Sequence, residues 1–153
     1  MSAGGPLLLD TNIVLELVRN KNLGTRISSQ FSLADTIHRP LISIVTVGEI
    51  WVLADQFGFG EVKRDFLQKV LSTLVILDIN QDSVVQAYVE VNRASRNAPG
   101  GARTLSNNDL WIAATAIAAE AAIVTTDQDF LFLHPEPCRV HYVNPVLPKE
   151  ESL

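Results

Sequence analysis

The chain has 153 residues, of which 47% are hydrophobic and 19% charged, and this composition excludes a disordered or low-complexity protein. A net charge of −5 and a pI of about 5.1 exclude a broad basic face for nucleic acid. A single cysteine excludes an internal disulfide, and the longest apolar stretch, Leu110 to Ala119, is too short to span a membrane. We therefore expect one domain over residues 1–153, without a secretory signal, in the reducing cytoplasm.

Five short apolar runs, each bounded by polar or turn-forming residues, predict β-strands. Most of the runs lack clean alternation, which is typical of strands that are buried on both faces of a parallel sheet. In chain order they are Leu7–Leu9, Leu41–Val45, Val75–Ile79, Ala122–Thr125 and Val140–Val143. A parallel sheet covered by helices is therefore the expected core.

Segments with helical spacing lie between the predicted strands. One set comprises Val62, Phe66 and Val70 with Leu67 and Leu71, and a later set comprises Val84, Val85, Tyr88 and Val91. Because strand and helix alternate along the chain, the fold class is α/β.

The alanine-rich segment Asp109–Ala121 is apolar on nearly all sides, which predicts a helix packed deep against the sheet. Ser106, three residues before Asp109, resembles the first residue of a capping box. The breaker cluster Asn97–Gly101 predicts an exposed loop before this helix. The core is expected over about residues 7–144, with 145–153 as a frayed tail.

Acidic residues follow the predicted strands at the positions where a parallel sheet binds its ligands, beyond the carboxyl ends of the strands. Asp10 ends the first run in LLLDTN, and Glu49 lies one turn into the helix that leaves the second strand, in SIVTVGEI. Asp109 begins the buried helix in SNNDLWIAATA, and Asp127 follows the fourth strand in IVTTDQDF. These carboxylates are distant in sequence, so only a folded domain can bring them together.

Carboxylates within about 4–6 Å of one another repel, unless a cation lies between them. Oxygen ligands without a nearby histidine or cysteine favour the hard cations Mg²⁺ or Mn²⁺ over zinc or copper. Because Mg²⁺ binds one or two carboxylates together with substrate phosphate oxygens, such a site suits phosphodiester hydrolysis. The pattern leaves open whether one or two ions bind.

The segments LLLDTN, SIVTVGEI, SNNDLWIAATA and IVTTDQDF, in this order, resemble the four signature segments of the PIN-domain family, most closely those of VapC-type toxins. The resemblance covers roughly residues 7–144. It implies a three-layer α/β/α sandwich with a central parallel sheet, and an Mg²⁺- or Mn²⁺-dependent ribonuclease. It also implies a homodimer and an inhibitory antitoxin as partners.

The same resemblance assigns roles to individual positions. By position, Asp10, Glu49, Asp109 and Asp127 match the family's catalytic acidic residues, with Asp10, Asp109 and Asp127 as metal ligands. Asn12 and Thr46 match its supporting polar positions, and Asp129 is a fifth acidic candidate. This chain departs from the family pattern in a longer loop over Asn97–Arg103 and a later first segment, and both differences bear on substrate access more than on chemistry.

Purely structural roles are alternatives for three of the four acids. Asp109 and Asp127 are each suited to capping a helix or turn, and Asp10 to a strand-to-helix junction. Glu49 lies amid apolar residues and needs a polar partner if it is buried. Coincidence of all four positions is much less expected than capping by any one of them.

Several other polar and aromatic residues are weaker candidates. Arg93, Arg96 and Arg103 flank the predicted loop, where Arg96 and Arg103 can grip RNA phosphates, although a solvated surface is the simpler interpretation. His38, His134 and His141 share no ligand spacing. Cys138 lies in no motif, and the two tryptophans, Trp51 and Trp111, are expected in the core or at an interface.

The leading hypothesis is thus an endoribonuclease that acts as the toxin of a toxin–antitoxin pair. A catalytically silent module that binds RNA or protein is the alternative. A phosphatase or a DNA-directed nuclease can use the same cation chemistry.

Overall fold

A five-stranded parallel sheet lies at the centre of the computed structural model, which describes residues 5–146. The strands are β1 (Leu7–Leu9), β2 (Leu41–Ser43), β3 (Val75–Leu77), β4 (Ala122–Thr125) and β5 (Val140–Tyr142). Their spatial order is β3-β2-β1-β4-β5, and every pairing is parallel. The chain builds outward from β1 on one side and from β4 on the other, so the winding direction changes between β1 and β4.

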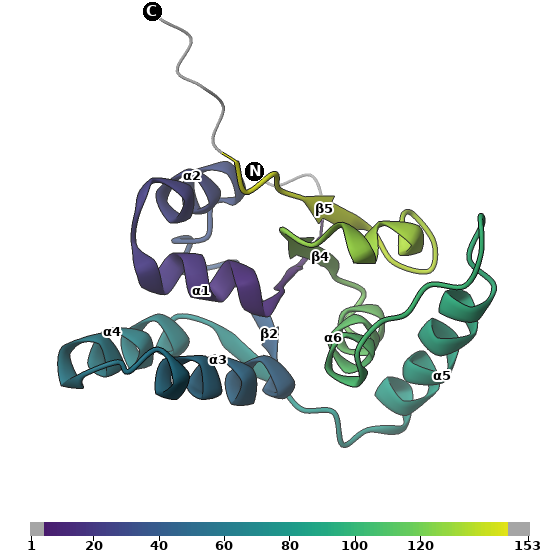
Figure 1. Ribbon diagram of the computed structural model, residues 1–153, viewed down its shortest axis with the longest axis horizontal. Coiled ribbons are helices and arrows are strands. Elements are labelled where there is room, and N and C mark those ends of the chain that lie inside the picture. Colours follow the sequence, from purple (N-terminus) through teal and green to yellow (C-terminus); the bar gives the residue numbers. More distant parts are fainter. Residues whose placement is uncertain (1–4, 147–153) are drawn as a thin grey trace, which may run out of the picture.

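Helices cover both faces of this sheet, which confirms the α/β/α architecture (Figure 1). The helices are α1 (Thr11–Arg19), α2 (Asn22–Phe31), α3 (Ile44–Gln56), α4 (Glu61–Ser72), α5 (Asp82–Arg96) and α6 (Asn107–Ala118), with a 3₁₀ helix, η1 (Gln128–Leu133). The first four pack on one face, and α5, α6 and η1 pack on the other.

Alternate strand residues enter two separate hydrophobic cores. Leu9, Ile42 and Val124 pack with the α1–α4 helices, whereas Leu8 and Ile123 pack with α6 and η1. Because successive strand side chains point to opposite faces, burial on both faces requires apolar residues at every position. This is why the runs in the sequence lack alternation.

The predicted strands are all present, but three of them end earlier than expected. β2 was predicted to reach Val45, yet Ser43 ends it, because the Ser43 hydroxyl accepts a hydrogen bond from the Val45 N–H at 3.1 Å and caps α3. β3 ends at Leu77 rather than Ile79, and β5 at Tyr142 rather than Val143. The apolar residues after β2 and β3 therefore serve in a helix or a connection rather than in the sheet, whereas the Val143 N–H after β5 still donates to the Thr125 carbonyl of β4 at 2.8 Å.

The helix predicted over Asp109–Ala121 spans Asn107–Ala118 instead. It begins two residues earlier because the Ser106 hydroxyl accepts a hydrogen bond from the Asp109 N–H at 3.1 Å, the cap that the sequence indicated. It ends before Glu120, which adopts a left-handed φ of 53°. Most of its central residues are buried against the sheet, as predicted.

Residues 97–101 form the predicted loop, exposed except for Ala98. Most of the predicted tail, 147–153, lies outside the described residues, and Pro145 and Val146 are exposed. Over residues 5–146, no helix has the length and apolarity needed to cross a membrane.

Candidate active site

A cavity of about 720 Å³ lies at the carboxyl ends of the strands, where the winding direction changes. Its lining comes from the end of β1, the first turn of α1, one side of α3, the start of α6 and the residue that precedes η1. The four predicted carboxylates, Asp10, Glu49, Asp109 and Asp127, all line it. One edge of the sheet thus gathers acidic residues from four distant segments of the chain.

Asp10 is the most buried of the four, with 4% of its surface exposed. It caps α1, since its Oδ1 accepts a hydrogen bond from the Thr11 N–H at 2.8 Å, and its Oδ2 accepts one from the Thr125 hydroxyl at 2.7 Å. Burial raises the pKa of Asp10 to about 6, against these two hydrogen bonds, and the charges of Glu49 and Asp127 raise it further. The capping role and the place in the cavity therefore coexist.

Glu49 has the polar partners that its apolar surroundings require. Its Oε1 accepts a hydrogen bond from the Thr11 hydroxyl at 2.6 Å, and its Oε2 accepts one from the Asn108 amide at 3.1 Å. The Thr11 hydroxyl also lies 3.2 Å from the Thr46 hydroxyl. Because a hydroxyl carries one proton and that of Thr11 is engaged by Glu49, Thr46 is the donor in this second contact. The orientation of Glu49 is therefore fixed from both sides.

Asp127 combines a cap with a place in the cavity in the same way. Its Oδ1 accepts a hydrogen bond from the Asp129 N–H at 2.8 Å at the start of η1, and its own N–H donates to the Thr125 hydroxyl at 2.9 Å. Asp129, the fifth acidic candidate, is exposed and does not line the cavity. It contributes a backbone N–H rather than a carboxylate.

Asp109 is half-buried in the first turn of α6. Burial raises its pKa to about 7, the charge of Asp10 contributes next, and those of Glu49 and Asp127 add to the increase, against a lowering contact with Ser106. Each of the other three carboxylates is thus close enough to affect Asp109. Without a cation, this cavity disfavours full ionisation.

The chemistry of the lining suits a hard cation. The cavity offers carboxylate, amide and hydroxyl oxygens, and neither histidine nor cysteine lines it. As the side chains stand, no three His, Cys, Asp or Glu residues among residues 5–146 are close enough together to hold one metal ion. The donor types therefore fit Mg²⁺ or Mn²⁺, and binding requires the carboxylate side chains to turn toward a common point.

Three polar residues that the sequence did not single out hold the carboxylates in place. Thr11 bonds to Asp10 through its N–H and to Glu49 through its hydroxyl, and Thr125 joins Asp10 to Asp127. Asn108 supplies the second donor to Glu49. Their sequence signal is adjacency, because each lies one or two residues from a predicted acid.

The other predicted polar residues differ in their positions. Asn12 lines the cavity at its exposed rim, and Thr46 lies fully buried behind Thr11. Arg96 and Arg103 are exposed and do not line the cavity. Direct contact between these arginines and the acidic residues is therefore not part of the site.

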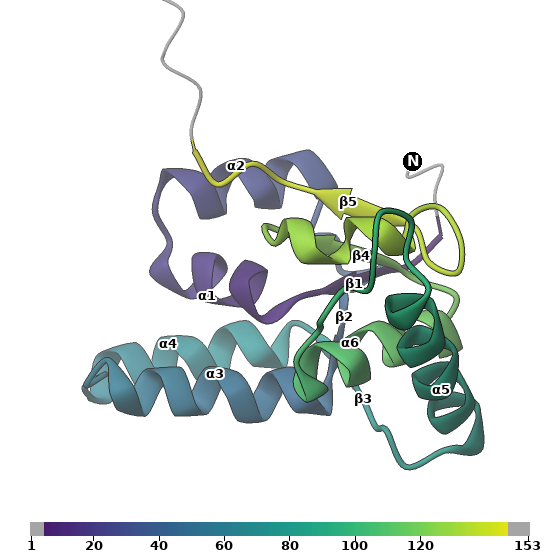
Figure 2. The same cartoon turned by 45° about the vertical axis from the view of Figure 1, so that its right-hand side comes forward.

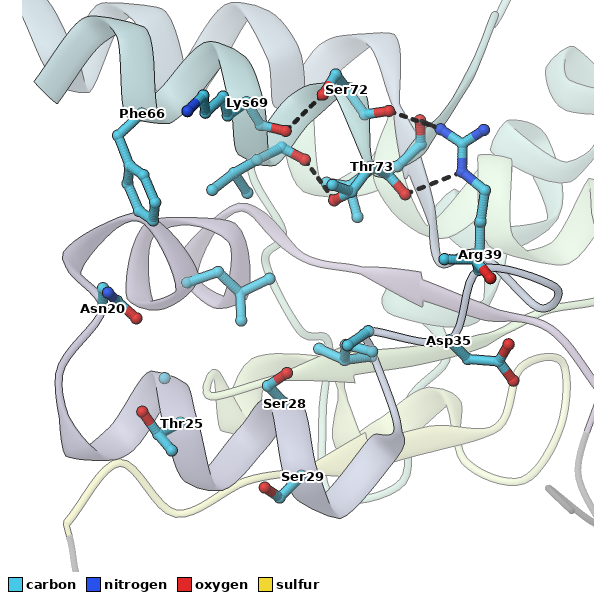
Figure 3. A pocket seen from close by; sticks show the side chains of 17 residues that line it. Asn20, Thr25, Ser28, Ser29, Asp35, Arg39, Phe66, Lys69, Ser72 and Thr73 are labelled. Carbon is cyan, nitrogen blue, oxygen red and sulfur yellow. Dashed lines mark hydrogen bonds between the residues drawn. The ribbon is translucent and has the colours of Figure 1, made fainter. Parts of the chain in front are cut away.

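A second cavity of about 760 Å³ lies between α2 and α4, and we call it the α2/α4 groove (Figure 3). Its only carboxylate is Asp35, which accepts hydrogen bonds from the Ile37 and His38 N–H groups and contacts the His38 ring. Arg39 donates to the carbonyl oxygens of Ser72 and Thr73. The groove therefore lacks a cluster of carboxylates.

Comparisons with known proteins agree with this architecture. The family model described as PIN domain matches residues 7–132. No curated protein matches the chain.

Solved structures with the same fold include bacterial toxin–antitoxin assemblies. VapBC2 from Rickettsia felis, bound to a promoter DNA fragment, has a TM-score of 0.71 at 23% identity, covering 90% of this chain and 98% of that one. VapBC-1 from nontypeable Haemophilus influenzae has a TM-score of 0.69 at 22% identity, covering 90% and 98%. A toxin–antitoxin complex from Klebsiella pneumoniae has a TM-score of 0.66 at 22% identity, covering 92% and 98%. At these identities the similarity establishes the fold.

Proposed function

Because the chain belongs to the PIN domain family, we propose that it is a metal-dependent endoribonuclease, which hydrolyses phosphodiester bonds in RNA. The observation that carries this proposal is the cavity at the carboxyl edge of the sheet. Four carboxylates from distant segments line it, and burial, followed by repulsion among these carboxylates, raises the pKa values of Asp10 and Asp109. A fold tolerates such crowding at a site that a cation neutralises during function.

Asp10, Asp109 and Asp127 are the residues that would hold Mg²⁺ or Mn²⁺. Asp10 and Asp127 follow adjacent parallel strands, and Asp109 lies across from them at the start of α6. When bound, such an ion stabilises charge on a phosphoryl oxygen and lowers the pKa of water. The Thr11 N–H and the Thr125 hydroxyl hold the Asp10 carboxylate, and the Asp129 N–H holds that of Asp127, so that the site is partly organised before the ion arrives.

Glu49 has a different role in this proposal. Both of its oxygens accept hydrogen bonds from neutral donors, Thr11 and Asn108, which hold the carboxylate in one orientation at the cavity wall. A carboxylate fixed in this way can orient an attacking water molecule and accept its proton at Oε2, on the side of exposed Asn108. Thr11 and Thr46 then act as positioning residues.

We also propose that the enzyme is the toxin of a toxin–antitoxin pair, acts in the cytoplasm and forms a homodimer. The solved structures that share its fold support an antitoxin protein as partner, since one of them is described as a toxin–antitoxin complex. Light scattering of the purified chain tests the dimer, which has twice the 16.8 kDa mass of one chain. Co-purification with the product of an adjacent small gene tests the antitoxin.

The test of the central proposal is RNA cleavage in the presence of Mg²⁺ or Mn²⁺. Asp109→Asn should lower the cleavage rate by about 10³-fold, because a catalytic cation supplies several kcal/mol of transition-state stabilisation. Asp35→Asn, in the α2/α4 groove, is the matched control and should leave the rate unchanged.

Two results would overturn the proposal. Equal rates for the wild type and Asp109→Asn would favour the silent binding module. Cleavage of DNA or a small phosphoester in preference to RNA, measured side by side, would favour the other phosphoester hydrolases.

A further inference from the structure

The segment from Val91 to Asn108 carries three arginines, Arg93, Arg96 and Arg103, and no acidic residue. It forms the last turns of α5, the following loop and the start of α6. In a chain with a net charge of −5, this is a local reversal of sign. We call these three residues the arginine arm.

The arginine arm is exposed and has unused hydrogen-bonding capacity. All three residues are exposed, and within residues 5–146 none of their guanidinium groups has a hydrogen bond or an ion pair. Four other arginines are engaged in the fold: Arg19 with Glu16, Arg26 with the Asn144 carbonyl, Arg39 with the end of α4, and Arg64 with the Phe59 carbonyl. The arm is therefore not needed to satisfy other groups in the described structure.

The backbone ties the arm to the acidic cavity. The Arg103 N–H donates to the Ser95 carbonyl at 2.7 Å, which holds the returning loop beside the last turn of α5 and next to Arg96. Leu105 is buried and anchors the loop on the core, and Ser106 lines the cavity. Figure 2 shows this loop running from the end of α5 to the start of α6.

The distance from Arg103 to the cavity is short on the scale of a nucleic acid. Arg103 lies three positions before Ser106, so their Cα atoms are at most about 11 Å apart, the limit of an extended chain. The exposed residues Ala102, Arg103 and Thr104 lead along the chain toward Ser106 at the cavity. A strand whose phosphate is cut in the cavity can therefore place neighbouring phosphates beside the arm.

We propose that the arginine arm binds backbone phosphates of single-stranded RNA next to the scissile bond. This inference rests on the proposed ribonuclease function. An acidic cavity repels a polyanion, and a nearby set of free guanidinium groups offsets that repulsion through bidentate contacts with phosphate. The arginine arm thereby attracts RNA locally, although the net negative charge of the chain repels it.

The test measures RNA affinity rather than cleavage. A short fluorescent single-stranded RNA of mixed sequence is titrated with Asp10→Asn protein in Mg²⁺, with and without the triple change Arg93→Gln, Arg96→Gln and Arg103→Gln. Each lost phosphate contact should lower the slope of log affinity against log salt by about 0.7. The affinity advantage of the intact arm should thus shrink by roughly 20-fold between 50 and 200 mM salt.

Arg139→Gln is the matched control. Arg139 is also exposed, but it directly precedes β5, at the amino ends of the strands and opposite the cavity. Its removal changes the net charge by one without touching the arm, so the salt slope should stay at the value of the parent protein. Melting temperatures of all variants verify that they are folded.

Specific outcomes would overturn the proposal. An unchanged salt slope in the triple variant, or a loss of slope per removed charge that is equal in Arg139→Gln, would show that the arm does not contact RNA. Loss of binding to an acidic antitoxin segment with RNA affinity unchanged would assign the arm to a protein partner. If the triple variant cleaves RNA and binds it with unchanged affinity, the arginine arm does not bind RNA, but the proposed nuclease activity stands. If RNA binding depends on the arginine arm and no cleavage is detected, the nuclease proposal fails and the RNA-binding proposal stands.

Discussion

The acidic cavity and the α2/α4 groove have similar volumes, about 720 and 760 Å³, but differ in how their charges are arranged. In the groove, Arg39 serves the carbonyl groups at the end of α4, and Asp35 serves its own loop, over a floor of apolar side chains that includes Leu33 and Phe66. In the acidic cavity, burial and then the charges of the neighbouring carboxylates raise the pKa of Asp109. Carboxylates clustered without a cationic partner, rather than the volume of the cavity, therefore mark the site where chemistry is expected.

The largest stability effect in this comparison is expected from the groove. Leu33→Ala removes a side chain that is 7% exposed and belongs to the α1–α4 core. We expect a loss of roughly 3 kcal/mol in the free energy of unfolding, through lost burial and a residual void. Urea unfolding measures this loss as a lower midpoint. If folded Leu33→Ala protein also cleaved RNA much more slowly than the wild type, the groove would contribute to catalysis as well as to stability, which would contradict the distinction between the two regions.

In the acidic cavity, by contrast, removal of a negative charge should stabilise the metal-free protein. The pKa of Asp10 is raised by burial from an ordinary 3.8 to about 6, so the folded state binds a proton more tightly than the unfolded state. The associated stability is present below about pH 4 and is lost as pH rises through 6, amounting to about 3 kcal/mol. Metal-free wild type should therefore lose stability between pH 4 and 7, and Asp10→Asn should lose less.

The difference between these two proteins isolates Asp10 from other titrating groups. His141, for example, has a pKa lowered by burial and so contributes stability in the opposite sense as pH rises, but it does so equally in both proteins. Urea midpoints in a chelator at several pH values supply the measurement. If the free energy of unfolding changed with pH by the same amount in the wild type and Asp10→Asn, the ionised Asp10 carboxylate would not destabilise the metal-free protein, contrary to this prediction.

A smaller effect is expected from a residue that organises the cavity without ionising. Thr125→Val removes the hydroxyl that donates to Asp10 and accepts from the Asp127 N–H, with little change in shape. Loss of such an outer partner typically lowers metal affinity or activity by about 10–100-fold. Thr125→Ser should restore most of the Mn²⁺ affinity in a calorimetric titration. Equal affinities for the valine and serine variants would show that the hydroxyl is dispensable.

The sequence predicts the sheet and the acidic positions for a clear physical reason. Strands buried on both faces leave continuous apolar runs, and residues that follow parallel strands, or that begin the helix leading back into one, lie at the same edge, so the gathering of Asp10, Glu49, Asp109 and Asp127 was foreseeable. Helix α2 was not predicted individually, because its Ser-, Thr- and Gly-containing sequence buries only Gly24 and Ile27. Gly24 is required there because a Cβ would collide with the Glu16 carbonyl of α1.

The hydrogen bonds that Thr11 and Thr125 make to the acidic residues could not be predicted from the sequence, for a different reason. The Thr11 hydroxyl reaches Glu49 only because α1 begins beside α3, and the Thr125 hydroxyl reaches the Asp10 carboxylate only because β4 lies next to β1. A single hydroxyl that joins residues 115 positions apart has no local pattern. Residue type and adjacency suggest such candidates, whereas their partners follow from the tertiary structure.

The central claim is that the acidic cavity binds a divalent cation. The most direct test is to measure the melting temperatures of the wild type and Asp109→Asn at increasing concentrations of Mg²⁺ or Mn²⁺. At a concentration 100 times the dissociation constant, binding adds about 2.7 kcal/mol to stability, which raises the melting temperature of a domain of this size by roughly 5–10 °C. The wild type should show this rise, and Asp109→Asn should show little of it. Identical melting curves for the two proteins at every metal concentration would contradict the claim that these carboxylates form a cation site.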